Sequence, residues 1–226
     1  GVPLRRLAGG AGEEHALAEA QRRGAAPPQG RVALAHHRQL DEASRMALKG
    51  LCHKTGLRID DIIQQIGDAP AVYVAGSRLS YTFAYYLGWS LAKVRKGVNI
   101  LKGSDSTAFD RLNNASAGAL VVIVATSRYP NELIRLAKVV RRLDLTLLVM
   151  ADSPLCPLFP FAHKTMVLPS QSIPYIGYIA AIASVISCMI LELAARQRET
   201  VRPHQERLEQ IYLENDILFN LPMIDG

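Results

Sequence analysis

Apolar and helical patterns alternate along this chain from residue 71 to residue 168. Short apolar runs rich in β-branched side chains recur there, which is typical of strands that are buried on both faces. Strands are expected at 71–75, 98–101, 119–124, 145–150 and 164–168. Strands that are separated by helices favour a parallel sheet with right-handed crossovers. The pattern therefore predicts an α/β fold, a three-layer α/β/α sandwich around a five-stranded parallel sheet.

Apolar residues at helical spacing fill the segments around these runs. Helices are expected at 32–53, at 60–66 with Asp60 as its cap, at 80–93, around 109–112, at 131–142 and at 173–195. A charged segment follows over 197–214. The run 173–195 has the length to span a bilayer. It contains Pro174 and Gly177, however, and we interpret it as a helix buried within the α/β domain.

The three cysteines lie far apart, at positions 52, 156 and 188. Their odd number and wide spacing argue against a disulfide framework and favour a reducing compartment. No pair of them has the spacing of a metal site. The first residues also lack the apolar core of a signal peptide. We therefore expect a cytoplasmic protein that holds neither a metal nor a cofactor.

The net charge of +6 suits an anionic partner, either nucleic acid or a phosphorylated metabolite. Basic residues outnumber acidic ones over residues 1–58. We interpret this excess as a solvated helical surface. The alternative is a connection to a nucleic-acid-binding part of the protein.

Loops rich in small hydroxyl residues follow four of the predicted strands. They are GSRLS at 76–80, GSDS at 103–106, ATSR at 125–128 and ADSP at 151–154. The carboxyl ends of parallel strands lie at one edge of a sheet, so these loops can share a ligand. Hydroxyls and free backbone N–H groups at a strand–helix turn suit a small anion such as phosphate.

These four loops, in this order and spacing, resemble those of the SIS (sugar isomerase) family. That family has a five-stranded flavodoxin-like fold that binds phosphosugars. The run DSPLCPL at 152–158 is similar to the DSPLSPL segment of sensor domains in RpiR-type bacterial transcription regulators. Residues 104–106 match the Ser-Asp-Ser of the same family. The resemblance implies a phosphosugar-binding domain over 35–215, after an N-terminal extension or truncated remnant at 1–34 and before a C-terminal tail at 216–226.

The chain departs from the family pattern in two places. RpiR-type regulators carry a helix-turn-helix domain ahead of the sensor, and residues 1–30 lack the apolar pattern of such a bundle. The family's phosphate loop reads Ser-x-Ser-Gly-x-Thr, whereas residues 125–130 read ATSRYP. Ser127 is retained, and Thr126 can replace the missing hydroxyl. Arg128 stands where glycine would let the backbone approach a phosphate, and it can supply a charge-assisted contact instead.

Eight residues at the ends of the predicted strands are expected to contact the phosphosugar. They are Ser77, Arg78, Ser104, Ser106, Thr126, Ser127, Arg128 and Ser170. The serines have an alternative role as helix caps, and the arginines can be solvated surface residues. Asp152 and Ser153 are expected to fix a turn and a cap, and Glu132 to favour its helix dipole.

No catalytic residue is expected, because sugar-phosphate isomerisation needs a base in reach of the sugar and no loop offers one. His163 and His204 are interpreted as surface or packing residues. Glu192 lies on the long apolar helix. It is either a general base or a residue at the point where the helix reaches solvent, and we favour the second interpretation.

The sequence thus predicts the phosphosugar-sensing domain of an RpiR-like regulator. One alternative is a sugar-phosphate isomerase, and another is a scaffold that has lost its ligand. DNA binding is expected only through a helix-turn-helix domain that is not evident in the sequence. The apolar helices 81–93 and 178–195 exceed what one small core needs, so a homodimer or tetramer is expected.

Overall fold

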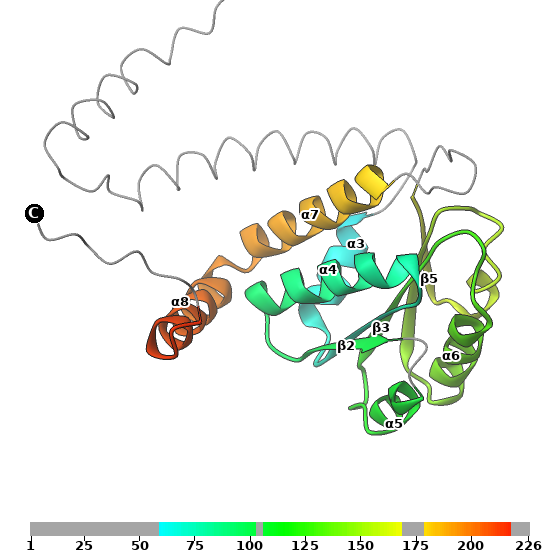
Figure 1. The fold of residues 1–226 in the computed structure, drawn as a ribbon, viewed down its shortest axis with the longest axis horizontal. Helices are drawn as coiled ribbons and strands as arrows, with labels where there is room; N and C mark the ends of the chain where they lie inside the picture. Colours follow the sequence, from blue (N-terminus) through cyan, green and yellow to red (C-terminus); the bar gives the residue numbers. More distant parts are fainter. Residues whose placement is uncertain (1–58, 103–105, 169–178, 218–226) are drawn as a thin grey trace, which may run out of the picture. The chain divides into compact units, whose positions relative to one another are not determined.

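One parallel sheet organises the computed structural model, which describes residues 59–102, 106–168 and 179–217. The elements are α3 (Ile59–Asp68), β1 (Val72–Gly76), α4 (Leu79–Val94), β2 (Val98–Lys102), α5 (Thr107–Asn113), β3 (Leu120–Ala125), α6 (Asn131–Arg142), β4 (Thr146–Ala151), the 3-10 turn η1 (Phe159–Phe161), β5 (Lys164–Val167), α7 (Ile179–Arg196) and α8 (Arg198–Glu214). Figure 1 follows them along the chain. The predicted helix 32–53 lies outside the described residues, as do residues 173–178 of the long apolar run.

The strands are ordered β2-β1-β3-β4-β5 and every neighbouring pair is parallel. The predicted α/β/α fold with five parallel strands is therefore confirmed. The chain moves from β1 to β2 on one side and then to β3 on the other side of β1. Such a reversal is a topological switch point, and folds of this class bind ligands beyond the carboxyl ends of the two strands that flank it. Here those strands are β1 and β3.

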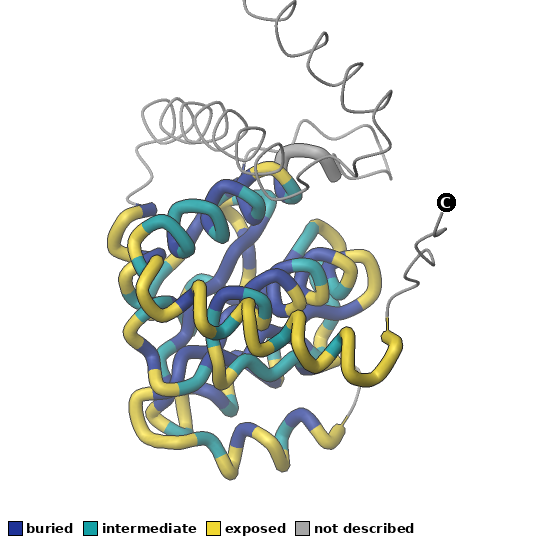
Figure 2. The backbone as a smooth tube through the Cα atoms, turned by 90° about the vertical axis from the view of Figure 1, so that its left-hand side faces the viewer, coloured by how far each residue is buried: buried dark blue, intermediate teal, exposed yellow. Residues whose placement is uncertain are grey.

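Alternating strand residues divide the interior between two faces of the sheet, as the period of two requires. Val72 and Val74 of β1 pack with α3, α4 and α7, whereas Tyr73 and Ala75 pack with α5 and α6. Figure 1 shows these two helical layers on opposite sides of the strands. The central strands β1, β3 and β4 are almost entirely buried, whereas the edge strands β2 and β5 are partly exposed. In Figure 2 exposed residues mark the outer faces of the helices.

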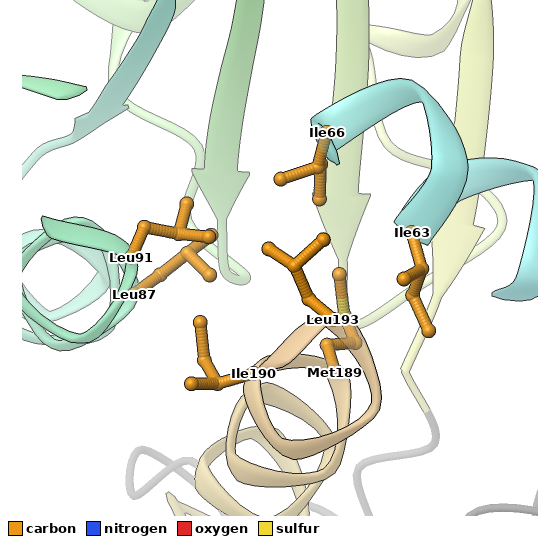
Figure 3. Close-up of a pocket in the computed structure, with 7 residues that line it drawn as sticks. All are labelled: Ile63, Ile66, Leu87, Leu91, Met189, Ile190 and Leu193. Carbon is orange, nitrogen blue, oxygen red and sulfur yellow. The ribbon is translucent and has the colours of Figure 1, made fainter. Parts of the chain in front are cut away.

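The contact of α3, α4 and α7 is dry and apolar (Figure 3). Seven side chains pack here so closely that no water molecule fits between them. They are Ile63, Ile66, Leu87, Leu91, Met189, Ile190 and Leu193. This contact therefore offers no room for a ligand. The apolar run at α7 is thus covered by other helices, and no helix in the described part of the chain is long and apolar enough to cross a membrane.

Gly76, the last residue of β1, lets α4 begin directly over the end of its strand. A Cβ atom at this position would lie 2.6 Å from the backbone oxygen of Ser80 and 2.8 Å from the Cβ of Ala84. The first contact is with backbone and cannot relax by a rotamer change. The turn from β1 into α4 therefore depends on glycine at position 76.

Candidate anion site at the carboxyl ends of β1 and β3

The loops after β1 and β3 bring together most of the residues that the sequence predicts for the site. Ser77 and Arg78 follow β1, and Thr126, Ser127 and Arg128 follow β3, its direct neighbour. Ser106 follows β2, on the other side of β1, and is exposed. Ser104 and Ser170 lie outside the described residues.

Exposed cations line this edge of the sheet. Arg78 and Arg128 are exposed in their loops, and exposed Lys102 ends β2. One cation therefore stands at the end of each of the three neighbouring strands β2, β1 and β3. Three cations in a row of this kind favour the approach of an anion to this edge of the sheet.

Ser77 is 2% exposed, and its hydroxyl donates a hydrogen bond of 2.5 Å to Oε1 of Glu132 in the first turn of α6. This bond is the largest influence that lowers the pKa of Glu132, and the charge of Arg78 contributes in the same direction. The hydroxyl of Ser80 donates to the Ser77 carbonyl at 2.7 Å and accepts from the Ser77 backbone N–H at 3.2 Å. Ser77 thus joins the start of α4 to the start of α6.

Asp152, the first residue after β4, binds the loop after β3 through three hydrogen bonds. Its Oδ2 accepts from the backbone N–H of Ser127 at 2.7 Å and from the Ser127 hydroxyl at 2.6 Å. Its Oδ1 accepts from the Tyr129 hydroxyl at 2.9 Å. Burial and the bond to Asp152 raise the pKa of Tyr129, so the phenol stays protonated and donates. A carboxylate held by a backbone N–H and two hydroxyls is a bound anion supplied by the chain itself.

The remaining ionisable candidates lie elsewhere. Nδ1 of His163 accepts from the backbone N–H of Leu147 at 3.0 Å. The ring of His204 bonds to the carbonyl of Ala92 at 2.9 Å. Glu192 pairs with Arg196 at 3.0 Å, one turn further along α7. Within the described ranges no three His, Cys, Asp or Glu side chains are grouped as a metal site would need.

Comparison with known proteins decides the family. The model of the SIS domain matches residues 65–195, more than half of the chain. The chain belongs to the SIS domain family. No curated protein sequence matches that of this SIS domain closely enough to count as a relative.

Solved structures share the fold of this SIS domain at low sequence identity. The sugar isomerase domain of the RpiR transcription factor from Sphaerobacter thermophilus is 20% identical, with a TM-score of 0.63 over 67% of this chain and 85% of that one. The Vibrio vulnificus NanR protein complexed with ManNAc-6P is 15% identical, with a TM-score of 0.61 over 83% and 70%. A hypothetical protein from Methanococcus jannaschii, whose structure led to the inference of a 3-hexulose-6-phosphate isomerase function, is 13% identical, with a TM-score of 0.57 over 76% and 96%.

The two loops of this SIS domain adopt backbone conformations that usually require glycine. Arg78 has φ of 54° and Arg128 has φ of 70°. For a side-chain-bearing residue this region costs about 1–2 kcal/mol. Arg128 stands where the family pattern has glycine, so the loop keeps a left-handed residue without the glycine itself. The hydrogen bonds of Ser77 and of Ser127 hold the two loops in these conformations.

Sequence reasoning did not anticipate four features of the site. These are Lys102 at the edge, Tyr129 as a donor, Glu132 as the acceptor for Ser77, and Asp152 as the acceptor for Ser127. One signal was available for the last of them. Ala125, the last residue of β3, pairs with Ala151, the last residue of β4. Ser127 lies two positions after Ala125, and Asp152 lies one position after Ala151. An Asp directly after one strand and a free N–H after its neighbour point to this bond.

Proposed function

We propose that this SIS domain binds a phosphorylated sugar and serves as the sensor of an RpiR-like transcription regulator. The observation that carries the proposal is the row of three exposed cations, Lys102, Arg78 and Arg128, at the ends of three neighbouring strands. They flank hydroxyl loops at the β1/β3 switch point. The segment DSPLCPL and the likeness to an RpiR sugar isomerase domain and to NanR with ManNAc-6P support the same class.

In this proposal the sensor spans residues 35–215 of a cytoplasmic protein, and the phosphate lies against the loop 126–128. Arg128 and Arg78 supply charge, and Thr126 supplies a hydroxyl. Ser106 approaches from the β2 side. Regulation of DNA binding belongs to a helix-turn-helix domain, which the described residues do not include.

A sugar-phosphate isomerase is the second candidate, because a carboxylate does lie at this edge. Glu132, which accepts the hydrogen bond of Ser77, is a candidate general base. Its pKa is lowered by the Ser77 bond, however, whereas an efficient base at neutral pH has its pKa raised toward 7. The direction of this shift favours binding over proton transfer.

Thermal-shift and calorimetric titrations with hexose and pentose phosphates test the proposal. We expect at least one phosphosugar to stabilise the protein and its unphosphorylated sugar to have no effect. Arg128→Gln should weaken this binding about tenfold, which is the loss of one charge-assisted contact. Lys164→Gln is the matched control, because Lys164 begins β5 at the opposite edge of the sheet.

Equal binding of the phosphorylated and the free sugar would contradict the proposal, as would an unchanged affinity in Arg128→Gln. An aldose–ketose interconversion assay on the same protein separates the two candidates. If the protein interconverts an aldose and a ketose phosphate and Glu132→Gln abolishes this activity, the isomerase is the correct function and the sensor is not.

A further inference from the structure

We propose that the carboxylate of Asp152 occupies the anion cradle of the loop after β3, so that a phosphate binds there only when this carboxylate moves away. The inference rests on the proposed function to the extent that the ligand carries a phosphate. It adds to that site a carboxylate of the chain that competes with the phosphate, and it identifies this carboxylate as Asp152.

The donors of the loop define the cradle. A backbone N–H and a hydroxyl that converge on one oxygen are what a phosphate at a strand–helix turn requires. In this chain both groups of Ser127 converge on Oδ2 of Asp152, at 2.7 Å and 2.6 Å. Each of these groups has a single hydrogen to donate. Ser127 therefore cannot serve Asp152 and a phosphate at once.

Two further contacts hold the carboxylate in place. The Tyr129 hydroxyl donates to the other oxygen at 2.9 Å, so both carboxylate oxygens are used. Asp152 is also tethered to β4, the strand next to β3, and its effective concentration at the loop is high. A free phosphate must compete with an anion that is always present.

A similar arrangement occurs in the neighbouring loop after β1. The hydroxyl of Ser77 donates to Glu132 at 2.5 Å, so Ser77, like Ser127, donates to a carboxylate of the chain. A phosphate beside an ionised Asp152 would also meet like charge. The exposed Arg78 and Arg128 attract the ligand. Displacement of Asp152 then releases the loop after β3 from the end of β4.

Titration of the full chain with inorganic phosphate, followed by calorimetry and by the NMR shift of the Ser127 amide, tests this inference. Asp152→Ala removes the competitor, and Asp152→Asn removes its charge while keeping its shape. We expect phosphate to bind at least tenfold more tightly to Asp152→Ala than to the wild type, with Asp152→Asn in between. Asp68→Asn, which removes the same charge at the amino end of β1, should bind as the wild type does.

The outcomes separate this inference from the proposed function. If the wild type and both Asp152 variants bind phosphate equally well, the inference is overturned, whereas the proposed phosphosugar site is not affected. If no variant binds phosphate or any sugar phosphate, both are overturned. Should Asp152→Ala fail to fold by circular dichroism, the comparison of Asp152→Asn with Asp68→Asn decides, with tighter binding to Asp152→Asn as the supporting result.

Discussion

Ser77 illustrates how much one side chain contributes at this site. It is buried, and its hydroxyl is the principal cause of the lowered pKa of Glu132. A group with a lowered folded pKa stabilises the protein above its unfolded pKa, about 4.3 for Glu. That stability is lost as the pH falls through the folded value.

We therefore expect Ser77→Ala to lower the free energy of unfolding by about 1 kcal/mol at pH 7. The difference from the wild type should narrow as the pH falls below the unfolded value of Glu132, and it should close once Glu132 is protonated in the folded wild type as well. Urea denaturation at several pH values measures this difference in the free energy of unfolding. A side-chain carbon titration by NMR should place the pKa of Glu132 higher in the variant. An unchanged Glu132 titration would show that the bond to Ser77 is not its cause.

The candidate residues could be predicted by type, because hydroxyls and cations after buried strands are visible in the sequence. Their hydrogen-bond partners were largely hidden, and Asp152, directly after its strand, was the one partner with a signal in the sequence. Whether the Ser127 hydroxyl faces solvent or Asp152 depends on a few ångströms of loop geometry. The conformation of the loop was also hard to predict, because Arg128 adopts a left-handed backbone conformation that glycine usually indicates in a sequence.

Among the elements, α3 is tied to the end of α4 by one arginine. Arg95 follows α4, and its guanidinium donates to the carbonyl of Ala69 at 2.5 Å and to that of Ile66. These acceptors belong to the last turn of α3 and the residue after it, where carbonyls lack partners within the helix. The guanidinium of Arg95 is partly buried, and this desolvation lowers its pKa.

Arg95→Met should cost about 2 kcal/mol of unfolding free energy, since charge-assisted hydrogen bonds are lost and the carbonyls of α3 are left unpaired. Arg95→Lys, which keeps the charge but not the forked donors, should recover part of that loss. Guanidinium denaturation of the three proteins gives the values. A Met variant as stable as the wild type would mean that water replaces the guanidinium without cost.

Element boundaries were predictable where the apolar period is strong. The helix expected at 131–142 is α6, with the same limits, and the helix expected at 80–93 is one residue longer at each end. The charged segment 197–214 has no comparable period, and it nevertheless forms α8. Contact with α4 accounts for this helix, since Tyr212 of α8 meets Lys93 of α4. Such long-range support has no signature in a local pattern.

At the scale of the whole molecule, α4 presents an apolar surface to solvent. Tyr85 is 50% exposed and Trp89 is 49% exposed, one turn apart on the outer side of the helix. Lys93 lies over the Trp89 ring at 4.9 Å. Aromatic residues of this size at a helix surface are typical of subunit contacts. We therefore expect the domain to form a dimer through the surface that contains Tyr85 and Trp89.

Trp89→Glu should convert this dimer to a monomer. Light scattering after gel filtration should give twice the 24.7 kDa mass of the chain for the wild type and the single mass for the variant. Leu155→Glu is the matched control, because Leu155 is 87% exposed in the loop after β4 and should leave the mass unchanged. A monomeric wild type, or a dimeric Trp89→Glu variant, would exclude α4 as the contact.

The close approach of Gly76 to Ser80, together with the bond from the Ser80 hydroxyl to the Ser77 carbonyl, ties the loop after β1 to the first turn of α4. The sixteen residues of α4 form a rod of roughly 24 Å. We expect a ligand that shifts this loop to shift α4 as well, and with it Tyr85 and Trp89 on the outer side of the helix. By thermodynamic reciprocity, a subunit contact at these two residues would then change ligand affinity by the same factor as the ligand changes the subunit contact.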